Sequence, residues 1–313
     1  MLRDGLRACL LAGIWFVPRE GEVLMIINNG AQSVTIAAAA IASASALAFA
    51  FASPTALAQE AAGVRGQILS AFYGLDNSRR IRVRTLLPCR GVNGRDGMPV
   101  IFSEEIDSST LDPKKFRITM ASGKVGRVGC VTLRPADEPG EKRTVLVIGE
   151  FGSADDQPLK VEIVGDLMSL DRKKGFKGAK ADVIPLKAGP TMILAEEIPQ
   201  QNWRLGTRGN CPRSGVRSVV RVTWVGGITK PGGAEIDDKE RQLYRVTVRK
   251  ADGGLATVTP IAIADLNDND NNHELCVGTD GQPVSVFFPA GALADPNGDL
   301  NPETEVKVSV GRS

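Results

Sequence analysis

The sequence predicts an all-β protein in which two β-sandwich domains follow a cleaved signal peptide. Short runs rich in Val and Ile recur along the chain, and turn-forming Gly, Pro, Asn and Asp separate them. An uncharged Ala-rich stretch precedes these runs, and four cysteines lie among them. Helical patterning is confined to residues 108–115 and 66–72, where we expect a turn or two of helix.

The first element along the chain is the predicted export signal. Residues 31–59 contain no charged side chain, and they include the helix-breaking Pro54 followed by the small-x-small sequence Ala56-Leu57-Ala58. We therefore predict cleavage after Ala58. A retained anchor is the alternative, but an Ala-rich stretch of this length is near the lower limit for spanning a membrane. The mature chain is expected to be periplasmic or extracellular, without a transmembrane segment.

The mature part divides into two predicted domains. Residues 1–58 hold the signal peptide and an upstream extension, with Met25 as an alternative start. The remaining 255 residues (313 minus 58) suit two domains of ordinary size. The Pro- and Gly-containing segment 185–191 marks the boundary, so the domains are residues 59–187 and 188–313.

The first domain is predicted to contain a series of short strands. They are residues 81–87, 98–102, 116–120, 144–149, 160–165 and 181–186. The sequence PVIFSEEIDSSTLDPKKFRITMASGKVG, which begins at Pro99, is similar to the opening of the bacterial Ig-like domains of surface-layer and envelope proteins. In this resemblance a strand ends at Phe102-Ser103, a short helical segment carries Leu111 toward the core, and Phe116 opens the next strand. The resemblance covers about residues 98–186 and implies a spacer or binding surface without an active site.

The second domain repeats the same pattern. Its predicted strands are residues 219–225, 243–248, 256–263, 283–288 and 304–310. Trp224 and Tyr244 resemble the strand aromatics of a fibronectin type III domain, and the sequence Leu300-Asn-Pro-Glu-Thr304 is similar to that family's approach to its last strands. The resemblance implies an Ig-like or fibronectin-like sandwich.

Cysteine usage fits an oxidising compartment. Cys89, Cys130, Cys211 and Cys276 follow the predicted signal, and an even number in an exported chain predicts disulfides. Their distribution suggests the pairs Cys89–Cys130 and Cys211–Cys276, although four cysteines allow three connectivities and the sequence does not choose among them. A zinc site is disfavoured because the chain has no Cys-x-x-Cys sequence and one histidine.

Charge and aromatic content exclude other partner classes. Thirty-eight basic and 36 acidic residues give a net charge of +2, so no strong field attracts nucleic acid or an anionic membrane. Aromatic residues make up 5% of the chain, which argues against base-stacking surfaces and against many aromatic-lined sugar grooves. Trp203, in a polar loop, is the candidate ligand-contacting aromatic residue.

Two loops of the second domain are candidate calcium sites. The first contains Asp265, Asn267, Asp268, Asn269 and Asp270, and the second contains Asp295, Asn297 and Asp299. Alternating Asp and Asn side chains supply the oxygen ligands that Ca²⁺ prefers, and the two loops are expected to meet at one end of a sandwich. The first loop resembles the linker that ends a cadherin repeat and holds calcium, although it fails the EF-hand spacing at every start. The alternative is that both loops are solvated turns.

His273 is the only histidine, so a mechanism that needs a histidine base must use it. No Gly-x-Ser-x-Gly sequence accompanies it, and we expect it to form a surface pair with Glu274. These features predict a non-catalytic structural, adhesion or binding module of the bacterial cell envelope, with Ca²⁺ as candidate cofactor and an envelope protein or polysaccharide as partner. The first alternative is an accessory pair of polysaccharide-binding domains, and the second alternative is a hydrolase centred on His273.

Overall fold

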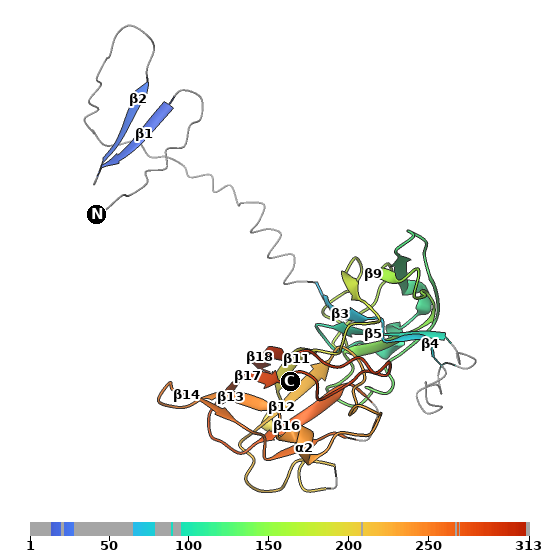
Figure 1. The fold of residues 1–313 in the computed structure, drawn as a ribbon, viewed down its shortest axis with the longest axis vertical. Helices are drawn as coiled ribbons and strands as arrows, with labels where there is room; N and C mark the ends of the chain where they lie inside the picture. The colour runs from blue at the N-terminus through green and yellow to red at the C-terminus, as the bar shows by residue number, and fades with distance from the viewer. Residues whose placement is uncertain are drawn as a thin grey trace. The chain divides into compact units, whose positions relative to one another are not determined.

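The computed structural model describes residues 14–19, 22–27, 65–78, 89, 95–207, 209–266, 268 and 270–310. The predicted signal peptide at 31–58 and the predicted strand at 81–87 lie outside these residues. Strands β1 (Ile14–Arg19) and β2 (Glu22–Ile27) pair as an antiparallel hairpin in the unit Met1–Ala52. The rest of the chain, Ser53–Ser313, is a separate compact unit (Figure 1).

The first eight-stranded sheet follows the order β6-β9-β10-β3-β5-β8-β7, with β4 paired to β5. Its strands are β3 (Ile68–Phe72), β4 (Leu75–Ser78), β5 (Arg95–Phe102), β6 (Phe116–Met120), β7 (Arg127–Thr132), β8 (Thr144–Glu150), β9 (Pro158–Ile163) and β10 (Lys180–Ile184). Two 3₁₀ turns, η1 (Ser108–Thr110) and η2 (Pro113–Lys115), lie where a short helical segment is predicted. The helix predicted at 66–72 is wrong: this segment is β3, hydrogen-bonded between β5 and β10.

The second eight-stranded sheet follows the order β14-β13-β17-β18-β11-β12-β16-β15. Its strands are β11 (Met192–Glu197), β12 (Ser218–Trp224), β13 (Arg245–Arg249), β14 (Leu255–Val258), β15 (Ala262–Ala264), β16 (Asn272–Val277), β17 (Gln282–Phe288) and β18 (Thr304–Val310). Two short helices, η3 (Gln200–Asn202) and α2 (Asp238–Arg241), join them. The single strand predicted at 256–263 is divided into β14 and β15, which lie at opposite ends of the strand order, because Pro260 cannot donate to a strand ladder.

Both sheets have the same connectivity, which their sequences do not reveal. In each, the first strand pairs in parallel with the last, as β3 with β10 and β11 with β18. When β4 and β14 are left out and the other seven strands of each sheet are numbered in chain order, the two sheets have the same order of neighbouring strands. The seven shared strands have the order of an Ig-type sandwich, in which strands one, two, five and four face strands three, six and seven. The prediction of two all-β sandwich-like domains is confirmed.

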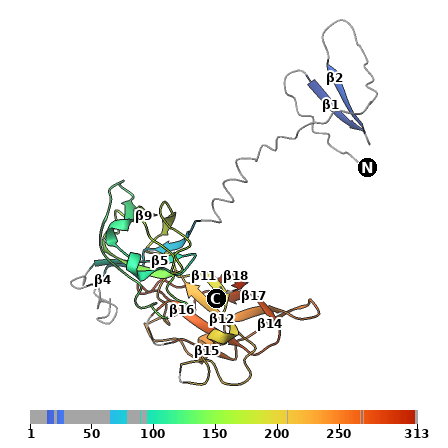
Figure 2. The same ribbon diagram turned by 180° about the vertical axis from the view of Figure 1, so that it is seen from behind.

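The last strand of each domain closes its sandwich by changing partners along its length. Thr304–Lys307 of β18 pairs with β17, and Val308–Val310 pairs with β11. In β10, Lys180–Asp182 pairs with β9, and Val183–Ile184 pairs with β3. Each sheet therefore folds back on itself, and β11, β12, β17 and β18 lie together in both views of the second domain (Figures 1 and 2).

Each domain has its own aromatic core. In the first, the ring of Phe102 lies 4.9 Å from that of Phe176 and 6.5 Å from that of Phe116, in edge contacts. In the second, Phe288 packs at 5.5 Å from Trp224 and 4.6 Å from Tyr244. All six rings are buried at 5% exposure or less, and they lie in the hydrophobic cores of the two sandwiches.

Both predicted disulfides are present. Cys89–Cys130 and Cys211–Cys276 have Cα–Cα distances of 5.8 and 5.7 Å, typical of disulfide-linked residues. Each bond lies within one predicted domain. No helix among the described residues has the length and apolarity needed to cross a membrane.

Candidate functional site

The strand that organises the candidate site is β12, which is buried on both faces. Val220, Val222 and Trp224 face the core of the second domain. On the other face, Arg221 lies opposite Glu274 of β16, and its Nη2 donates to the Glu274 Oε1 atom at 2.7 Å. A loop of the first domain covers this face, since Arg221 Nη1 donates to the carbonyl of Gly140 at 2.8 Å.

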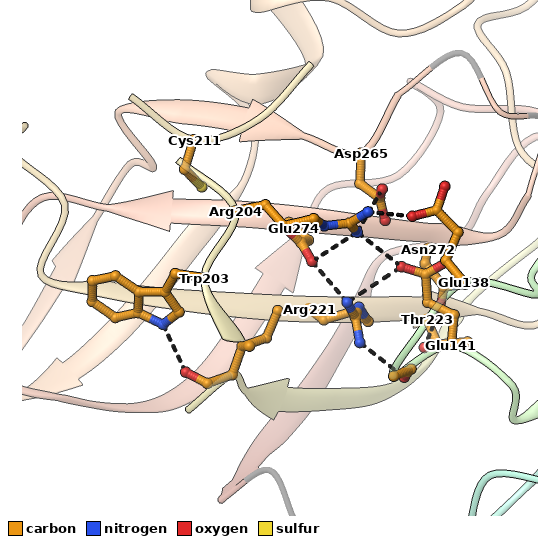
Figure 3. A network of polar contacts seen from close by, with 12 residues as sticks. Glu138, Glu141, Trp203, Arg204, Cys211, Arg221, Thr223, Asp265, Asn272 and Glu274 are labelled. Atoms are coloured by element: carbon orange, nitrogen blue, oxygen red, sulfur yellow. Dashed lines mark hydrogen bonds and ion pairs between the residues drawn. The ribbon is translucent and has the colours of Figure 1, made fainter. Parts of the chain in front are cut away.

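A second arginine joins the same cluster. Arg204 forms ion pairs with Glu138 and Glu141 from the loop between β7 and β8, and with Asp265 and Glu274 from the second domain (Figure 3). Its Nη2 lies 3.0 Å from Asp265 Oδ1 and 3.4 Å from the Oε1 atoms of Glu141 and Glu274. We call this set of six residues, Glu138, Glu141, Arg204, Arg221, Asp265 and Glu274, the ionic junction.

The centre of the ionic junction is buried. The side chains of Glu141, Glu274 and Asp265 are 0%, 3% and 7% exposed. Burial, together with contact with the Asp265 carboxyl group, raises the pKa of Glu141 well above its usual range. Two oxygens, Glu141 Oε2 and Asp265 Oδ2, accept no hydrogen bond within the described part of the chain. Each of these carboxylates therefore offers one oxygen to an arginine and keeps a second oxygen unpaired.

Local backbone geometry places the junction residues. Asp265 has a φ of 63°, a left-handed conformation that Asp tolerates better than most side chains, and its N–H donates to the carbonyl of Gly209 at 2.9 Å. Gly140 has a φ of 88°, and a Cβ atom there would lie 2.4 Å from Arg221 Nη1. Glycine at this position therefore allows the first-domain loop to approach the arginine closely.

Two further contacts join the domains beside the junction. Arg143 Nη2 bonds Glu196 Oε1 of β11 at 2.8 Å, and these side chains are 10% and 15% exposed. Gly226 packs against the buried ring of Phe72, because a Cβ at this glycine would lie 2.7 Å from that ring. The two sandwiches thus share polar and apolar contacts.

The predicted calcium loops meet at a cleft beside the junction. This cleft has a volume of about 590 Å³, and its wall includes Phe72 and Pro99 of the first domain and Asp268, Asp270 and Asp295 of the second. The structure therefore brings the two loops together, as expected, but against the first domain.

The first loop satisfies much of its own hydrogen-bonding capacity. Asp268 Oδ1 accepts from the N–H of Asp270 at 3.1 Å, and Asp270 accepts from Asn272 N and Nδ2 at 2.7 and 2.9 Å. Burial raises the pKa of both aspartates. Asn267 and Asn269 lie outside the described residues. The loop therefore forms the local hydrogen bonds expected of a turn, but it is largely buried and not solvated as that alternative supposed.

The second loop is built around Asp295. Its Oδ1 accepts from the backbone N–H groups of Asn297 and Asp299, both at 2.9 Å, and its Oδ2 accepts from Asn297 Nδ2 at 3.0 Å. Asn297 Nδ2 also donates to the carbonyl of Gly74 at 2.8 Å, which ties this loop to the first domain. Asp295 and Asn297 are thereby engaged in an Asx-type turn.

The other two candidates serve the packing of the second domain. Trp203 is partly buried against the cluster around Cys211–Cys276, and its Nε1 donates to the carbonyl of Ile198 at 2.8 Å. The surface pair predicted for His273 and Glu274 is wrong, because these residues are 4% and 3% exposed. His273 Nδ1 lies 3.0 Å from the hydroxyl of Tyr244 in the core.

Sequence analysis missed most of the ionic junction. Of its six residues only Asp265 and Glu274 are singled out from the sequence, whereas Glu138, Glu141, Arg204 and Arg221 receive no role. One signal is present in the sequence: Arg221 interrupts the apolar strand Val219–Val225 on the face opposite Trp224. When a strand is apolar on both faces except for one charged residue, that residue is expected to be buried beneath another part of the protein and paired with an opposite charge.

Comparisons with known proteins establish no family. No protein-family model matches the chain, and no curated protein matches it. Among solved structures, the N-terminal part of the bacterial S-layer protein SbsC is similar at 13% identity and a TM-score of 0.28, over 82% of this chain and 47% of that one. Domains 1–6 of SbsC give 14% identity, a TM-score of 0.28, and coverage of 82% and 27%. The chain thus spans less than half of either structure, and similarity at this level does not establish a shared fold.

Proposed function

We propose that this protein is an exported, non-catalytic structural or binding module of the bacterial cell envelope. The observation that carries the proposal is the ionic junction, where Arg221 and Arg204 of one sandwich meet buried carboxylates of both. Such a junction can hold two domains at one angle, because any other arrangement would leave buried charges without their partners, which is costly. A spacer or scaffold needs this property.

The compartment is supported by the two disulfides. Both join residues far apart in the chain, with separations of 41 and 65 residues, and such bonds persist in oxidising compartments. The non-catalytic assignment is supported by His273, whose imidazole is buried and bonded to Tyr244. Burial lowers its pKa to about 4, so at neutral pH the imidazole is uncharged and away from solvent.

Export and envelope association are testable together. The full chain with a C-terminal tag is expressed in a bacterial host, and the cells are separated into cytosol, periplasm, membrane and medium. We expect a mature form beginning at Gln59 outside the cytosol, with all four remaining cysteines protected from alkylation until reduction. The purified mature chain should sediment with isolated bacterial envelopes.

The matched control is Ala58→Asp, which places a charge where signal peptidase requires a small residue. This variant should accumulate as uncleaved precursor. A wild-type chain that stays uncleaved in the cytosol with reactive thiols contradicts export. A mature chain that fails to sediment with any envelope fraction contradicts the envelope assignment.

A further inference from the structure

We propose that the ionic junction binds one divalent cation, Ca²⁺, between the carboxylates of Glu141 and Asp265, with Glu138 as the third protein ligand. The site would join a loop of the first domain to a loop of the second. It differs from the candidate sites read from the sequence, with which it shares only Asp265.

Geometry supports the ligand set. Carboxylate oxygens of Glu138, Glu141 and Asp265 lie within 4.8 Å of one another. Glu141 Oε2 and Asp265 Oδ2 are buried and accept no hydrogen bond among the described residues, while the opposite oxygen of each group contacts Arg204. A buried carboxylate oxygen without a partner costs free energy, and a cation between the two unpaired oxygens removes that cost for both.

The charge balance indicates a divalent ion. With all four carboxyl groups ionised, Glu138, Glu141, Asp265 and Glu274 face the guanidinium groups of Arg204 and Arg221 and leave a net charge of −2 (two minus four). The raised pKa of Glu141 disfavours this ionised state unless a cation is bound. No other cationic side chain pairs with Glu141, Asp265 or Glu274 among the described ion pairs. One divalent cation neutralises this excess.

The donor set favours a hard cation. All three candidate ligands are carboxylates, which suit Ca²⁺ and Mg²⁺, whereas zinc and copper prefer imidazole or thiolate. Ca²⁺ accepts irregular geometry and completes its shell with water, and sites with few protein ligands fall in the millimolar to sub-millimolar affinity range of extracellular modules. This inference deepens the proposed function and rests on it only for the calcium supply outside the cell.

The experiment uses the mature full-length chain. Protein dialysed against EDTA is titrated with CaCl₂ and, separately, with MgCl₂, while binding is followed by calorimetry and unfolding by tryptophan fluorescence. We expect one Ca²⁺ per chain and a rise in Tm of about 5 °C or more at a hundredfold excess over Kd. Mg²⁺ should bind more weakly, because it demands a regular octahedral shell.

Variants assign the site. Glu141→Gln keeps the shape and removes the charge, and it should weaken Ca²⁺ binding at least tenfold and abolish the calcium-dependent rise in Tm. Glu138→Gln, at a more exposed position, provides the same test if Glu141→Gln does not fold. Asp166→Asn is the matched control, because the Asp166 side chain is 82% exposed in the first domain and should leave binding unchanged.

Three results overturn the proposal. The first is a Tm that responds to neither EDTA nor CaCl₂, which would mean that Glu141 and Asp265 share a proton. The second is unchanged calcium binding in both glutamate variants. The third is loss of binding in Asp299→Asn alone, which would place the ion in the second loop. None of these bears on cleavage, compartment or envelope sedimentation, so the proposed function is tested separately.

Discussion

At the residue scale, Trp224, Tyr244 and His273 form a buried hydrogen-bonded chain. Trp224 Nε1 donates to the Tyr244 hydroxyl oxygen at 3.1 Å, and that hydroxyl lies 3.0 Å from His273 Nδ1. Among the described hydrogen bonds, His273 Nδ1 is the only acceptor for the Tyr244 hydroxyl proton, so that proton is directed at the histidine and Nδ1 accepts it. Protonating Nδ1 would take this acceptor away and would place a charge in the core, so the core favours the neutral imidazole.

The pH dependence of stability should report this neutral histidine. Burial lowers the pKa of His273 from 6.5 to about 4 in the folded state, so the unfolded chain binds more protons between these values. The contribution of this group to the free energy of unfolding is therefore fully present above pH 6.5, and it is lost as the pH falls toward 4. Urea unfolding of the wild type should show this loss, with a slope approaching about 1.4 kcal/mol per pH unit relative to His273→Gln. Parallel profiles for the two proteins would contradict it.

Of these hydrogen-bonded residues, the sequence predicts the burial of Trp224 but not that of His273. Trp224 is identifiable as core because it lies in phase with Val220 and Val222 of a strong strand pattern. His273 is not, because every residue of β16 is buried, including the polar Asn272, His273 and Glu274. The burial of these polar groups depends on partners from β12, β13 and the first domain, which local sequence does not specify.

At the element scale, patterning identifies strands that bury one face. Strands β6 and β18 have the bounds expected from their sequences, and β5, β8 and β17 differ by a few residues at their ends. The strands β4, β7, β11 and β16 are not predicted. Of these, β7 is interrupted by Gly129 and β16 is dense in polar residues. Element boundaries thus depend on hydrogen bonding that spacing alone does not determine.

The Cys211–Cys276 disulfide should contribute strongly to the second domain. It ties the segment before β12 to β16 across a separation of 65 residues, and closing a loop of that length is worth about 4 kcal/mol in the chain-entropy account. The double variant Cys211→Ala/Cys276→Ala should lose a comparable free energy of unfolding in urea. Cys89→Ala/Cys130→Ala, which opens a loop of 41 residues, should lose nearly as much. A loss below about 1 kcal/mol in both would contradict this account.

At the scale of the whole molecule, the ionic junction is the feature that separate domain predictions do not reach. Glu141 contacts Arg204 and Arg221, which lie 63 and 80 residues further along the chain (204 minus 141 and 221 minus 141). The turn sequence containing Glu138 and the strand containing Arg221 are each interpretable alone. Their meeting depends on how the two sandwiches pack, and therefore on surfaces such as Phe72 against Gly226.

Removing Arg221 should be costly. Arg221→Met keeps the apolar length of the side chain but leaves Glu141 and Glu274 buried with one fewer partner, and breaking a buried pair typically costs about 3–5 kcal/mol. Thermal or urea unfolding should show this loss.

A surface pair is the matched control for that change. Arg172 pairs with Asp107, but its side chain is 66% exposed, so Arg172→Met should cost less than about 1 kcal/mol. Equal losses in the two variants would mean that the junction contributes no more than a surface pair.

The parallel pairing of first and last strands has a consequence for how the chain matures. A chain delivered N-terminus first cannot complete the first sandwich until β10 has emerged, nor the second until β18 has, because these strands join the two halves of each sheet. Glu138 and Glu141 therefore precede their arginine partners, which follow Glu141 by 63 and 80 residues. In a chain that folds from its N-terminus, the first sandwich can be complete before the second, so the ionic junction forms last.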